Sequence, residues 1–348
     1  MLILCFSALA LSVPVRAADE PPVSAESMIL IHADSGRELF SQDPDRPMRI
    51  ASTTKLMTAL TAVKTMDPDM EVEIREPWTR VEGSRAGLRA GERWTGRQLL
   101  EGLLLSSGND AAIAVAETVD GSIRRFADRM NREAEALGMR SSHFVNPHGL
   151  DADGHVSTAR DLAILMTAVM KEPLLREILA EPAWTFGGVT RENHNRLLWS
   201  CPGVDGGKTG FTRAAGRCLV STCCRDGLRL ICVTLSDPND WEDHAMLYDL
   251  AFARYELWSF WENRKIPSVP VLFATPDPPG PVGSDEGLFC VEKNRPVTVE
   301  WRLPPLLICP GRIREEGTAI VFSGGEELGT VSFYWPEAET WRSVLPGA

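Results

Sequence analysis

The sequence lacks the features on which several functional classes depend. It has no run of basic residues, and 48 aspartates and glutamates outnumber 36 lysines and arginines, giving a net charge of −12. Because phosphate binding needs clustered basic side chains, nucleic acid is excluded as a partner. No Cys-x-x-Cys pair is present, which argues against a structural zinc site. We therefore expect no metal ion, and nothing in the sequence indicates a cofactor.

Two further motifs are missing or incomplete. The Gly-x-Ser-x-Gly turn of the α/β-hydrolases does not occur. In "GVDGGKTGFT" (203–212), three residues separate Gly203 from the Gly-Lys-Thr, where a phosphate loop needs four. A phosphate loop also opens a helix, whereas two β-rich segments around the turn signal Arg225-Asp226-Gly227 follow here. The stretch is therefore no nucleotide site, and Lys208 belongs on or beside a strand.

The N-terminal residues are typical of an export signal. An apolar run of about a dozen residues ends in small residues, with Val15-Arg16-Ala17 as a cleavage site. The usual positively charged start is missing, and the run is too short to span a bilayer. We expect residues 1–18 to be an export signal, with an uncleaved anchor as the alternative. The terminal "PEAETWRSVLPGA" has no long apolar run, which leaves peripheral membrane association open.

The eight cysteines favour packing over a disulfide framework. Removal of the signal takes Cys5 away and leaves seven, an odd number, so at least one thiol is free. Four of them (Cys218, Cys223, Cys224 and Cys232) lie in the two strands expected around the Arg225-Asp226-Gly227 turn. Buried apolar packing is the simplest explanation for these four, although an exported protein could also form one disulfide.

Hydrophobic patterning predicts strands first, helices next and strands again. Residues 27–42 predict a hairpin, and 51–66 predict a helix with an apolar stripe. Residues 67–200 are mostly helical, with a break at Ser107-Gly108, and strands return from 204 to 236. A helix over 241–261 then closes this part of the chain. We expect an α+β fold in which the early hairpin and the late strands share one antiparallel sheet, flanked by helices and with a helical insertion.

A composition change marks a second, smaller domain. The chain becomes rich in Pro and Gly from about residue 266, and "TAIVFSGGEELGTVSFYW" (318–335) predicts a hairpin. We expect a domain over 24–263 and an all-β C-terminal domain over 266–348, which is large enough to be independent.

One Ser-x-x-Lys is present, at the start of the apolar-striped helix. Ser52 and Lys55 are three residues apart, so they share a helix face. A buried lysine near other cations has a lowered pKa and can act as a neutral base toward the serine hydroxyl. The helix N-terminus also favours developing negative charge. The ordinary structural explanation is a serine N-cap followed by a solvated lysine.

Two more motifs follow in a set order. Ser107-Gly108-Asn109 lies in the helix break, and Lys208-Thr209-Gly210 lies at the expected strand. Each has a structural explanation, namely a capping turn and an edge-strand lysine before a glycine bulge. Ser-x-x-Lys, a Ser-x-Asn and Lys-Thr-Gly in this order are together the signature of penicillin-binding proteins and class A β-lactamases.

The longer stretches around these motifs carry a more specific resemblance. "ASTTKLMTAL", "LLLSSGNDAAIAVAE", "NPHGLDADGHVSTARDLA" and "GVDGGKTGFTRAAGRCLV" resemble the low-molecular-weight penicillin-binding proteins, the serine-type D-alanyl-D-alanine carboxypeptidases of peptidase family S11. The resemblance covers nearly all of residues 24–262. It implies a β-lactamase/transpeptidase-like fold, peptidoglycan stem peptides ending in D-Ala-D-Ala as substrates, β-lactams as covalent inhibitors, and work outside the cytoplasm.

The resemblance also implies a role for each motif residue. Ser52 would attack the terminal peptide bond and form an acyl-enzyme, Lys55 would be its base, and Ser107 would pass the proton to the leaving D-alanine. The remaining residues would bind substrate: Asn109 its amide or the lysine, Lys208 and Thr209 its carboxylate, Gly210 its backbone, and the N–H groups of Ser52 and Phe211 the oxyanion. His148 would fix a loop.

Three other functions share these features in part. A β-lactamase would need a dedicated carboxylate to activate water, and no loop in the sequence is assignable to one. A DD-endopeptidase would use the same serine and lysine on crosslinked peptides. A catalytically inactive, exported wall-binding protein is the alternative from another class, and the three intact motifs argue against it.

Overall fold

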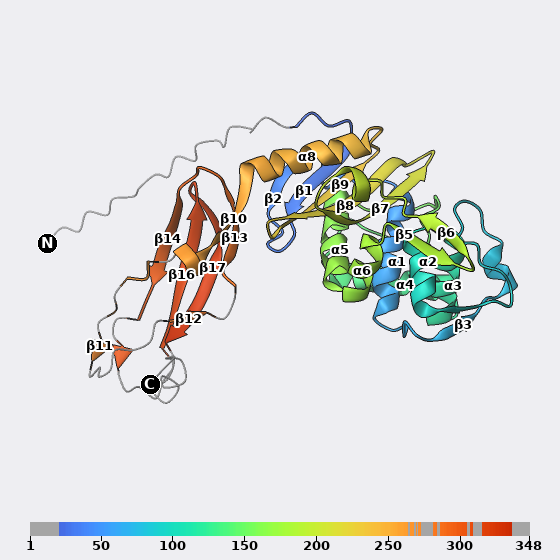
Figure 1. Cartoon of the computed structure of the whole chain (residues 1–348), viewed down its shortest axis with the longest axis horizontal. Helices are drawn as coiled ribbons and strands as arrows, with labels where there is room; N and C mark the ends of the chain where they lie inside the picture. Colours follow the sequence, from blue (N-terminus) through green and yellow to red (C-terminus); the bar gives the residue numbers. More distant parts are fainter. Residues whose placement is uncertain are drawn as a thin grey trace.

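The computed structural model describes residues 21–263, 265–267, 269, 271–272, 281–283, 286–304, 307–308 and 315–335. The expected export signal and the segment after Trp335 lie outside these residues. The described chain forms two bodies, a larger one with a sheet and most helices and a smaller one made of strands (Figure 1). Within the described part of the chain, none of the helices has both the length and the apolar character to cross a membrane.

A five-stranded antiparallel sheet organises the larger body. Its order is β2 (Glu38–Gln42), β1 (Ser27–His32), β9 (Leu228–Leu235), β8 (Gly216–Arg225) and β7 (Val204–Thr212). This confirms that the early hairpin joins the late strands. Asp226 and Gly227 both have positive φ, 49° and 81°, as the tight turn between β8 and β9 requires. Among the strands that the structure describes, β7 pairs with β8 alone, so it is an edge strand.

The sheet separates two layers of apolar side chains. Because strand side chains alternate between faces, Ile29 and Ile31 of β1 face α1 and α5, whereas Met28 and Leu30 face α8. The helices of the larger body are α1 (Thr54–Val63), α2 (Gly96–Leu104), α3 (Asn109–Asp120), α4 (Ile123–Ala136), α5 (Ala159–Lys171), α6 (Pro173–Ala180), α7 (Leu197–Ser200) and α8 (Asp240–Arg254). Two small hairpins, β3 (Glu71–Glu73) with β4 (Arg93–Thr95) and β5 (Ala183–Phe186) with β6 (Val189–Glu192), flank the helices.

The closing helix is shorter than expected. α8 ends at Arg254, and Tyr255–Ser259 continue as strand β10, antiparallel to β13 (Leu288–Glu292) of the smaller body. The expectation of a helix through residue 261 is therefore wrong. The segment "YELWS" carries β-favouring aromatic residues, and a partner strand from a distant part of the sequence decides its conformation. A short helix, α9 (Phe260–Asn263), follows.

The smaller body is a β-sheet domain, as expected. Its main sheet has the order β12 (Val282–Gly283), β17 (Glu326–Trp335), β16 (Glu315–Ser323) and β14 (Val297–Arg302), and β11 (Val271–Leu272) pairs with β15 (Leu307–Ile308). Phe260 packs into its core with Phe333. Arg37, between β1 and β2, links the bodies because its guanidinium donates to the Cys290 carbonyl (2.6 Å) and pairs with Glu326 (2.6 Å).

Candidate active site

Ser52 lies in a tight turn that leads into α1. Ala51–Thr53 form one 3₁₀ turn, and Ala51 has φ = 45°, an uncommon value for a residue with a side chain. Gly149 covers this turn so closely that a Cβ there would lie 1.9 Å from the Ala51 carbonyl oxygen. Contacts from a distant loop therefore hold the turn, and with it the Ser52 hydroxyl at the start of the helix.

Lys55 is fully buried and makes three short contacts. Its Nζ is 2.8 Å from Ser52 Oγ, 2.7 Å from Asn109 Oδ1 and 2.7 Å from the His148 carbonyl oxygen. Burial, and to a lesser extent the charge of Lys208, hold the pKa of Lys55 well below that of an exposed lysine, with Asp110 opposing them.

These contacts define the geometry of the neutral amine. A neutral amine has two N–H groups and one lone pair, and the two carbonyl-type oxygens of Asn109 and His148 only accept. The amide of Asn109 is oriented by its Nδ2, which donates to the Glu82 carbonyl at 2.7 Å. When Lys55 is neutral, its lone pair is therefore left for the hydroxyl proton of Ser52.

Ser107 and Asn109 come from the break between α2 and α3. Ser107 has φ = 54° and is 4% exposed, and Gly108 precedes the first turn of α3. The Asn109 backbone N–H donates to the Ser84 carbonyl at 2.8 Å. The left-handed backbone turns the Ser107 hydroxyl toward Lys208, whose Nζ lies 3.0 Å from Ser107 Oγ.

Lys208 is the second buried lysine of the site. It lies on β7, is 1% exposed, and donates to Ser107 Oγ and to the Thr209 carbonyl (2.8 Å). Burial lowers its pKa to about 7, so both protonation states are populated near neutral pH. The ammonium group of Lys208 contacts Ser107, and Ser107 and Thr209 line the cleft.

Gly210 brings β7 against the serine turn. A Cβ at Gly210 would lie 3.0 Å from the Ile50 carbonyl oxygen and 3.0 Å from the Ser52 backbone nitrogen. Only glycine fits this approach without movement of its neighbours. Phe211 follows, and its side chain is 66% exposed. The edge of β7 therefore runs past Ser52, where an extended peptide can align with it.

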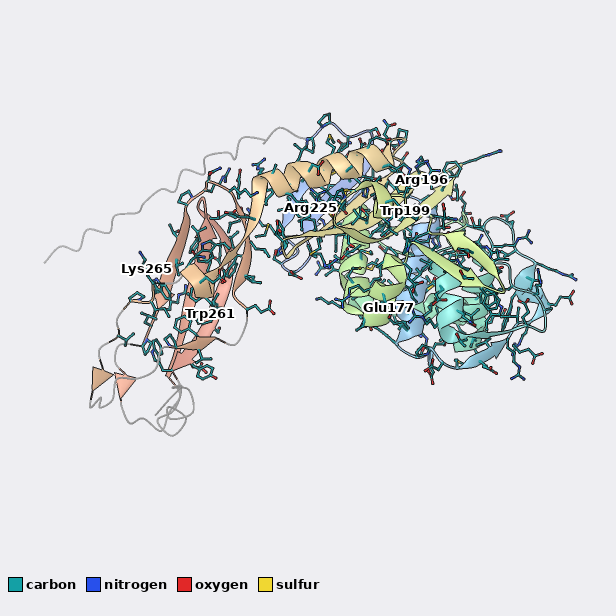
Figure 2. The ribbon with its side chains drawn as sticks, viewed as in Figure 1. Glu177, Arg196, Trp199, Arg225, Trp261 and Lys265 are labelled. Carbon is teal, nitrogen blue, oxygen red and sulfur yellow. The ribbon has the colours of Figure 1, made fainter. Side chains whose placement is uncertain are left out.

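The motif residues open into a cleft of about 730 Å³. Arg196, just before α7, and Trp199, within it, line this cleft. Figure 2 labels both side chains. Arg196 is exposed and Trp199 is 53% exposed. On another side Arg217 lines the cleft and pairs with Asp240. The remaining lining residues are Ser52, Ser84, Ser107, Glu192, Asn193, His194, Thr209, Gly210, Phe211, Asp240 and Trp241.

Several structural supports of the site were not identified from the sequence. Asp110, next to Asn109, accepts from the backbone N–H groups of Ala86 (2.7 Å), Gly87 (2.9 Å) and Leu88 (3.1 Å) and so holds the loop that carries Ser84. A buried acid directly after a Ser-x-Asn was the only available signal. Its partners are backbone groups, which no residue type reveals.

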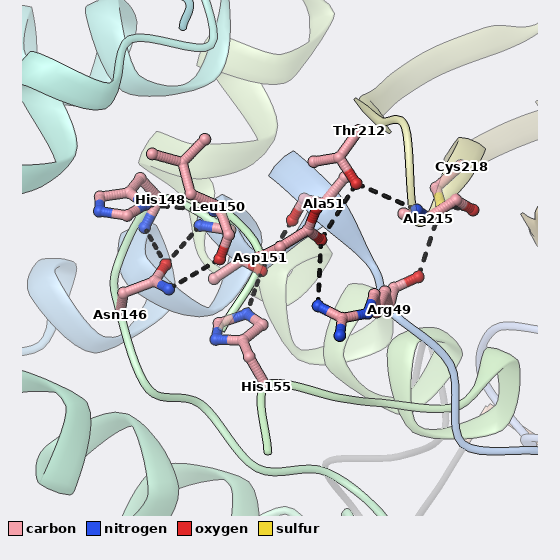
Figure 3. Close-up of polar contacts among 12 residues, drawn as sticks. Arg49, Ala51, Asn146, His148, Leu150, Asp151, His155, Thr212, Ala215 and Cys218 are labelled. Carbon is pink, nitrogen blue, oxygen red and sulfur yellow. Dashed lines mark hydrogen bonds and ion pairs between the residues drawn. The ribbon is translucent and has the colours of Figure 1, made fainter. Parts of the chain in front are cut away.

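The loop 146–151 is the other support (Figure 3). The Asn146 side chain accepts from the N–H groups of His148 (3.2 Å) and Gly149 (2.7 Å), and the His148 ring accepts from the Leu150 N–H (3.2 Å). Asp151 accepts from Thr212 of β7 at 3.1 Å and lies 3.5 Å from Arg49. Burial lowers the pKa of His148 to about 3. His148 thus fixes the loop, as expected, and presents its backbone carbonyl to Lys55.

The arrangement suits nucleophilic catalysis by a serine. The Ser52 hydroxyl lies beside a buried amine with a lowered pKa, and a second serine, Ser107, lines the same cleft and contacts the buried Lys208. In the part of the chain that the structure describes, no three His, Cys, Asp or Glu side chains are grouped to hold a metal ion.

Comparisons with known proteins all indicate one family. The family model of peptidase family S11, described as D-alanyl-D-alanine carboxypeptidase, matches residues 14–239. The chain is similar to D-alanyl-D-alanine carboxypeptidase DacF of Bacillus subtilis, with 34% identity over 69% of this chain and 65% of that protein. It is also similar to DacB2 of Mycobacterium tuberculosis, with 37% identity over 69% of this chain and 86% of that protein. The match thus spans slightly less than two thirds of the Bacillus protein.

A solved structure extends the similarity to both bodies. Penicillin-binding protein 6B of Escherichia coli superposes with a TM-score of 0.74 at 26% identity and covers 93% of this chain and 98% of its own. The C-terminal β-sheet domain is therefore part of the shared fold.

Proposed function

Since the chain belongs to the S11 family of D-alanyl-D-alanine carboxypeptidases, we propose that it removes the terminal D-Ala from peptidoglycan stem pentapeptides through an acyl-enzyme on Ser52. The observation that carries this proposal is the 2.8 Å contact between Ser52 Oγ and the buried Lys55 Nζ. The family acts on D-Ala-D-Ala peptides and binds penicillin. For this chain, the enzyme would work outside the cytoplasm, after export directed by residues 1–18, as a soluble or peripherally membrane-associated protein.

In the acylation step, neutral Lys55 takes the proton of Ser52 as Oγ attacks the carbonyl carbon of the penultimate D-Ala. The negative charge that develops on the carbonyl oxygen falls between the backbone N–H groups of Ser52 and Phe211, each donor typically contributing about 3 kcal/mol. The close approach of Gly210 to the Ser52 nitrogen supports this pairing.

Collapse of the tetrahedral intermediate requires a proton on the leaving nitrogen. Ser107 supplies it in this proposal, because its hydroxyl lies in the cleft and is bonded to Lys208 Nζ at 3.0 Å. Asn109 holds the substrate amide or Lys55. Thr209 and the positive charge of Lys208 bind the terminal carboxylate of the substrate. Arg196 contributes positive charge to the cleft wall, whereas the charge of Arg217 is paired with that of Asp240. Water then hydrolyses the ester, with Lys55 as the base.

The first test is a choice of substrates for the purified enzyme. We expect release of free D-alanine from a muropeptide pentapeptide, slow stoichiometric acylation by a fluorescent penicillin, and no loss of either in excess chelator. Faster cleavage of crosslinked dimers than of pentapeptide would instead show a DD-endopeptidase. Rapid turnover of nitrocefin would show a β-lactamase, and absence of a covalent label after denaturation would show an inactive wall-binding protein.

A second expected result concerns Lys208. Lys208→Gln keeps hydrogen-bonding groups near Ser107 and Thr209 but removes the positive charge. We therefore expect kcat/KM for D-alanine release to fall roughly 30- to 1000-fold. This corresponds to a loss of about 2–4 kcal/mol of transition-state stabilisation. Lys208→Arg should recover part of this loss, since it keeps the charge in a larger planar group.

The matched control is Lys171→Gln, which removes an exposed lysine at the end of α5. It should leave kcat/KM unchanged and shift stability by no more than about 0.5 kcal/mol. If Lys208→Gln melts like the parent and releases D-alanine at the parental rate, the role of Lys208 is refuted.

A further inference from the structure

Two cysteines outside the catalytic residues lie in contact with each other. Cys201 caps the C-terminal end of α7, and Cys223 lies on β8, where it pairs with Val204 of β7. The two thiols lie near enough for each to shift the pKa of the other, and the Cys223 thiol donates at 3.5 Å to the carbonyl of Pro202, the residue after Cys201. Both sulfurs are unbridged in the structure. Residues separated by 22 positions in the sequence thus bring their thiols together in the fold.

The surroundings of the pair distinguish the two sulfurs. Arg225 Nη2 lies 3.6 Å from Cys201 Sγ, and Arg225 Nε donates to the Pro202 carbonyl at 2.9 Å. Cys223 Sγ lies 3.5 Å from the same Pro202 carbonyl oxygen, to which its thiol can donate. Arg225 influences both sulfurs, but its guanidinium contacts the Cys201 sulfur directly, whereas the Cys223 thiol is directed at the Pro202 carbonyl.

This asymmetry assigns the two thiols different chemistry. The neighbouring Cys223 thiol and the charge of Arg225 lower the pKa of Cys201, against the effect of burial. The Cys201 thiol and burial raise the pKa of Cys223, against the effect of Arg225. A thiolate beside a cation and next to a second thiol is the arrangement in which exchange with a disulfide is favoured.

We propose that Cys201 and Cys223 are a redox-active dithiol, which an external disulfide converts into an intramolecular disulfide. The Cys201 thiolate attacks one sulfur of the external disulfide, forms a mixed disulfide and expels a thiolate. That thiolate takes the proton of Cys223, whose sulfur then attacks Cys201 Sγ and releases the second thiol. Two protein thiols are oxidised and one external disulfide is reduced to two thiols, so atoms and electrons balance.

The position of the pair gives the modification a consequence for the cleft. Cys201 directly follows α7, which carries Trp199 on the cleft wall, and directly precedes the strand with Lys208. Arg225 of β8, labelled in Figure 2, pairs with Asp249 of α8 at 2.8 Å. Cys223 lies two residues earlier on β8, so its sulfur belongs to a part of the body that this ion pair holds in place. A bridge would tie the α7–β7 connection to that fixed part.

The test uses the full chain, fully reduced and then exposed to oxidised glutathione. After rapid alkylation and digestion without reductant, mass spectrometry should find the Cys201 and Cys223 peptides joined, with no other linked pair. In Cys223→Ser, glutathione should remain trapped on Cys201, and in Cys201→Ser Cys223 should stay alkylatable. A linked pair that involves Cys224 or Cys232, or full alkylation of Cys201 and Cys223 in the parent, would overturn the proposal.

Two further variants serve as controls. Cys224→Ser removes the neighbouring thiol of the same strand, whose side chain points to the opposite face of the sheet from that of Cys223, and should form the 201–223 bridge at the parental rate. Arg225→Gln should slow formation of the mixed disulfide by about 3- to 10-fold at pH 6.5 and by less at pH 8.5, because it removes the cation that favours the thiolate. An equal effect at both pH values would contradict Cys201 as the attacking thiol. Since the readout is a bond between sulfurs, its failure is independent of whether the cleft releases D-alanine.

Discussion

Replacing Ser52 with alanine should abolish covalent labelling by penicillin and lower kcat for D-alanine release by at least about 10⁴-fold, because loss of a serine nucleophile removes the acyl-enzyme route altogether. The fold should persist. The Ser52 side chain is half-buried, and its hydroxyl contacts the Lys55 amine. The turn itself is held by Thr53 and Thr54, whose hydroxyls donate to the Ile50 and Ala51 carbonyls. Mass spectrometry of the penicillin-treated parent should place the acyl group on Ser52.

The control for this substitution is Ser122→Ala, remote from the cleft. Ser122 caps the N-terminus of α4 by accepting from the Arg125 N–H at 3.2 Å. Its loss should cost about 1 kcal/mol of stability and leave labelling intact. Ser52→Ala should therefore lose acylation and keep its stability, whereas Ser122→Ala should lose stability and keep acylation. Normal labelling of Ser52→Ala would rule out this residue as the nucleophile.

Replacing Lys55 with methionine should lower the rate of acylation by about 10²- to 10⁴-fold, the usual contribution of a general base. Methionine fills much of the same buried space without an amine. In the parent, acylation should rise as pH rises through the lowered pKa of Lys55, because only the neutral amine has a lone pair for the Ser52 proton. That rise should be absent in the variant, measured as the second-order rate of penicillin acylation against pH.

Lys64→Met provides the matched control, because Lys64 lies at the opposite end of α1 from Lys55. Lys64 follows α1 and pairs with Glu133 on the surface, away from the cleft. The Lys64→Met variant should retain the parental rate of acylation and the parental pH profile. A parental pH profile in Lys55→Met, at a rate near that of the parent, would show that another group takes the Ser52 proton.

The sequence alone predicted those parts of the molecule that depend on local chemistry. The apolar stripe of residues 51–66 predicted α1, the break at Ser107-Gly108 separates α2 from α3, and Asp226-Gly227 makes the hairpin turn. These are short-range signals, in which side-chain type sets backbone preference. The order of strands and helices along the chain also predicted one antiparallel sheet, because the early hairpin had few possible partners other than the late strands.

Motif chemistry was equally accessible from the sequence, but its geometry was not. Ser52, Ser107 and Lys208 are far apart in sequence, and their types and order alone indicated a shared site. That Lys55 reaches Asn109 and the His148 carbonyl depends on contacts across 54 and 93 residues. The His148 carbonyl, like the Glu82 carbonyl that orients Asn109, is a backbone group that any residue provides, so no sequence pattern marks it.

Tertiary structure alone decided the remaining features. Burial of Lys55 and Lys208, and hence their lowered pKa values, results from packing of α1, α3 and β7 around them. The end of α8 at Arg254 follows from pairing of β10 with a strand more than thirty residues later. The contact between Cys201 and Cys223 exists because β7 and β8 are antiparallel neighbours and α7 turns back onto them. In each case the free energy comes from partners distant in sequence, and only the folded chain brings those partners together.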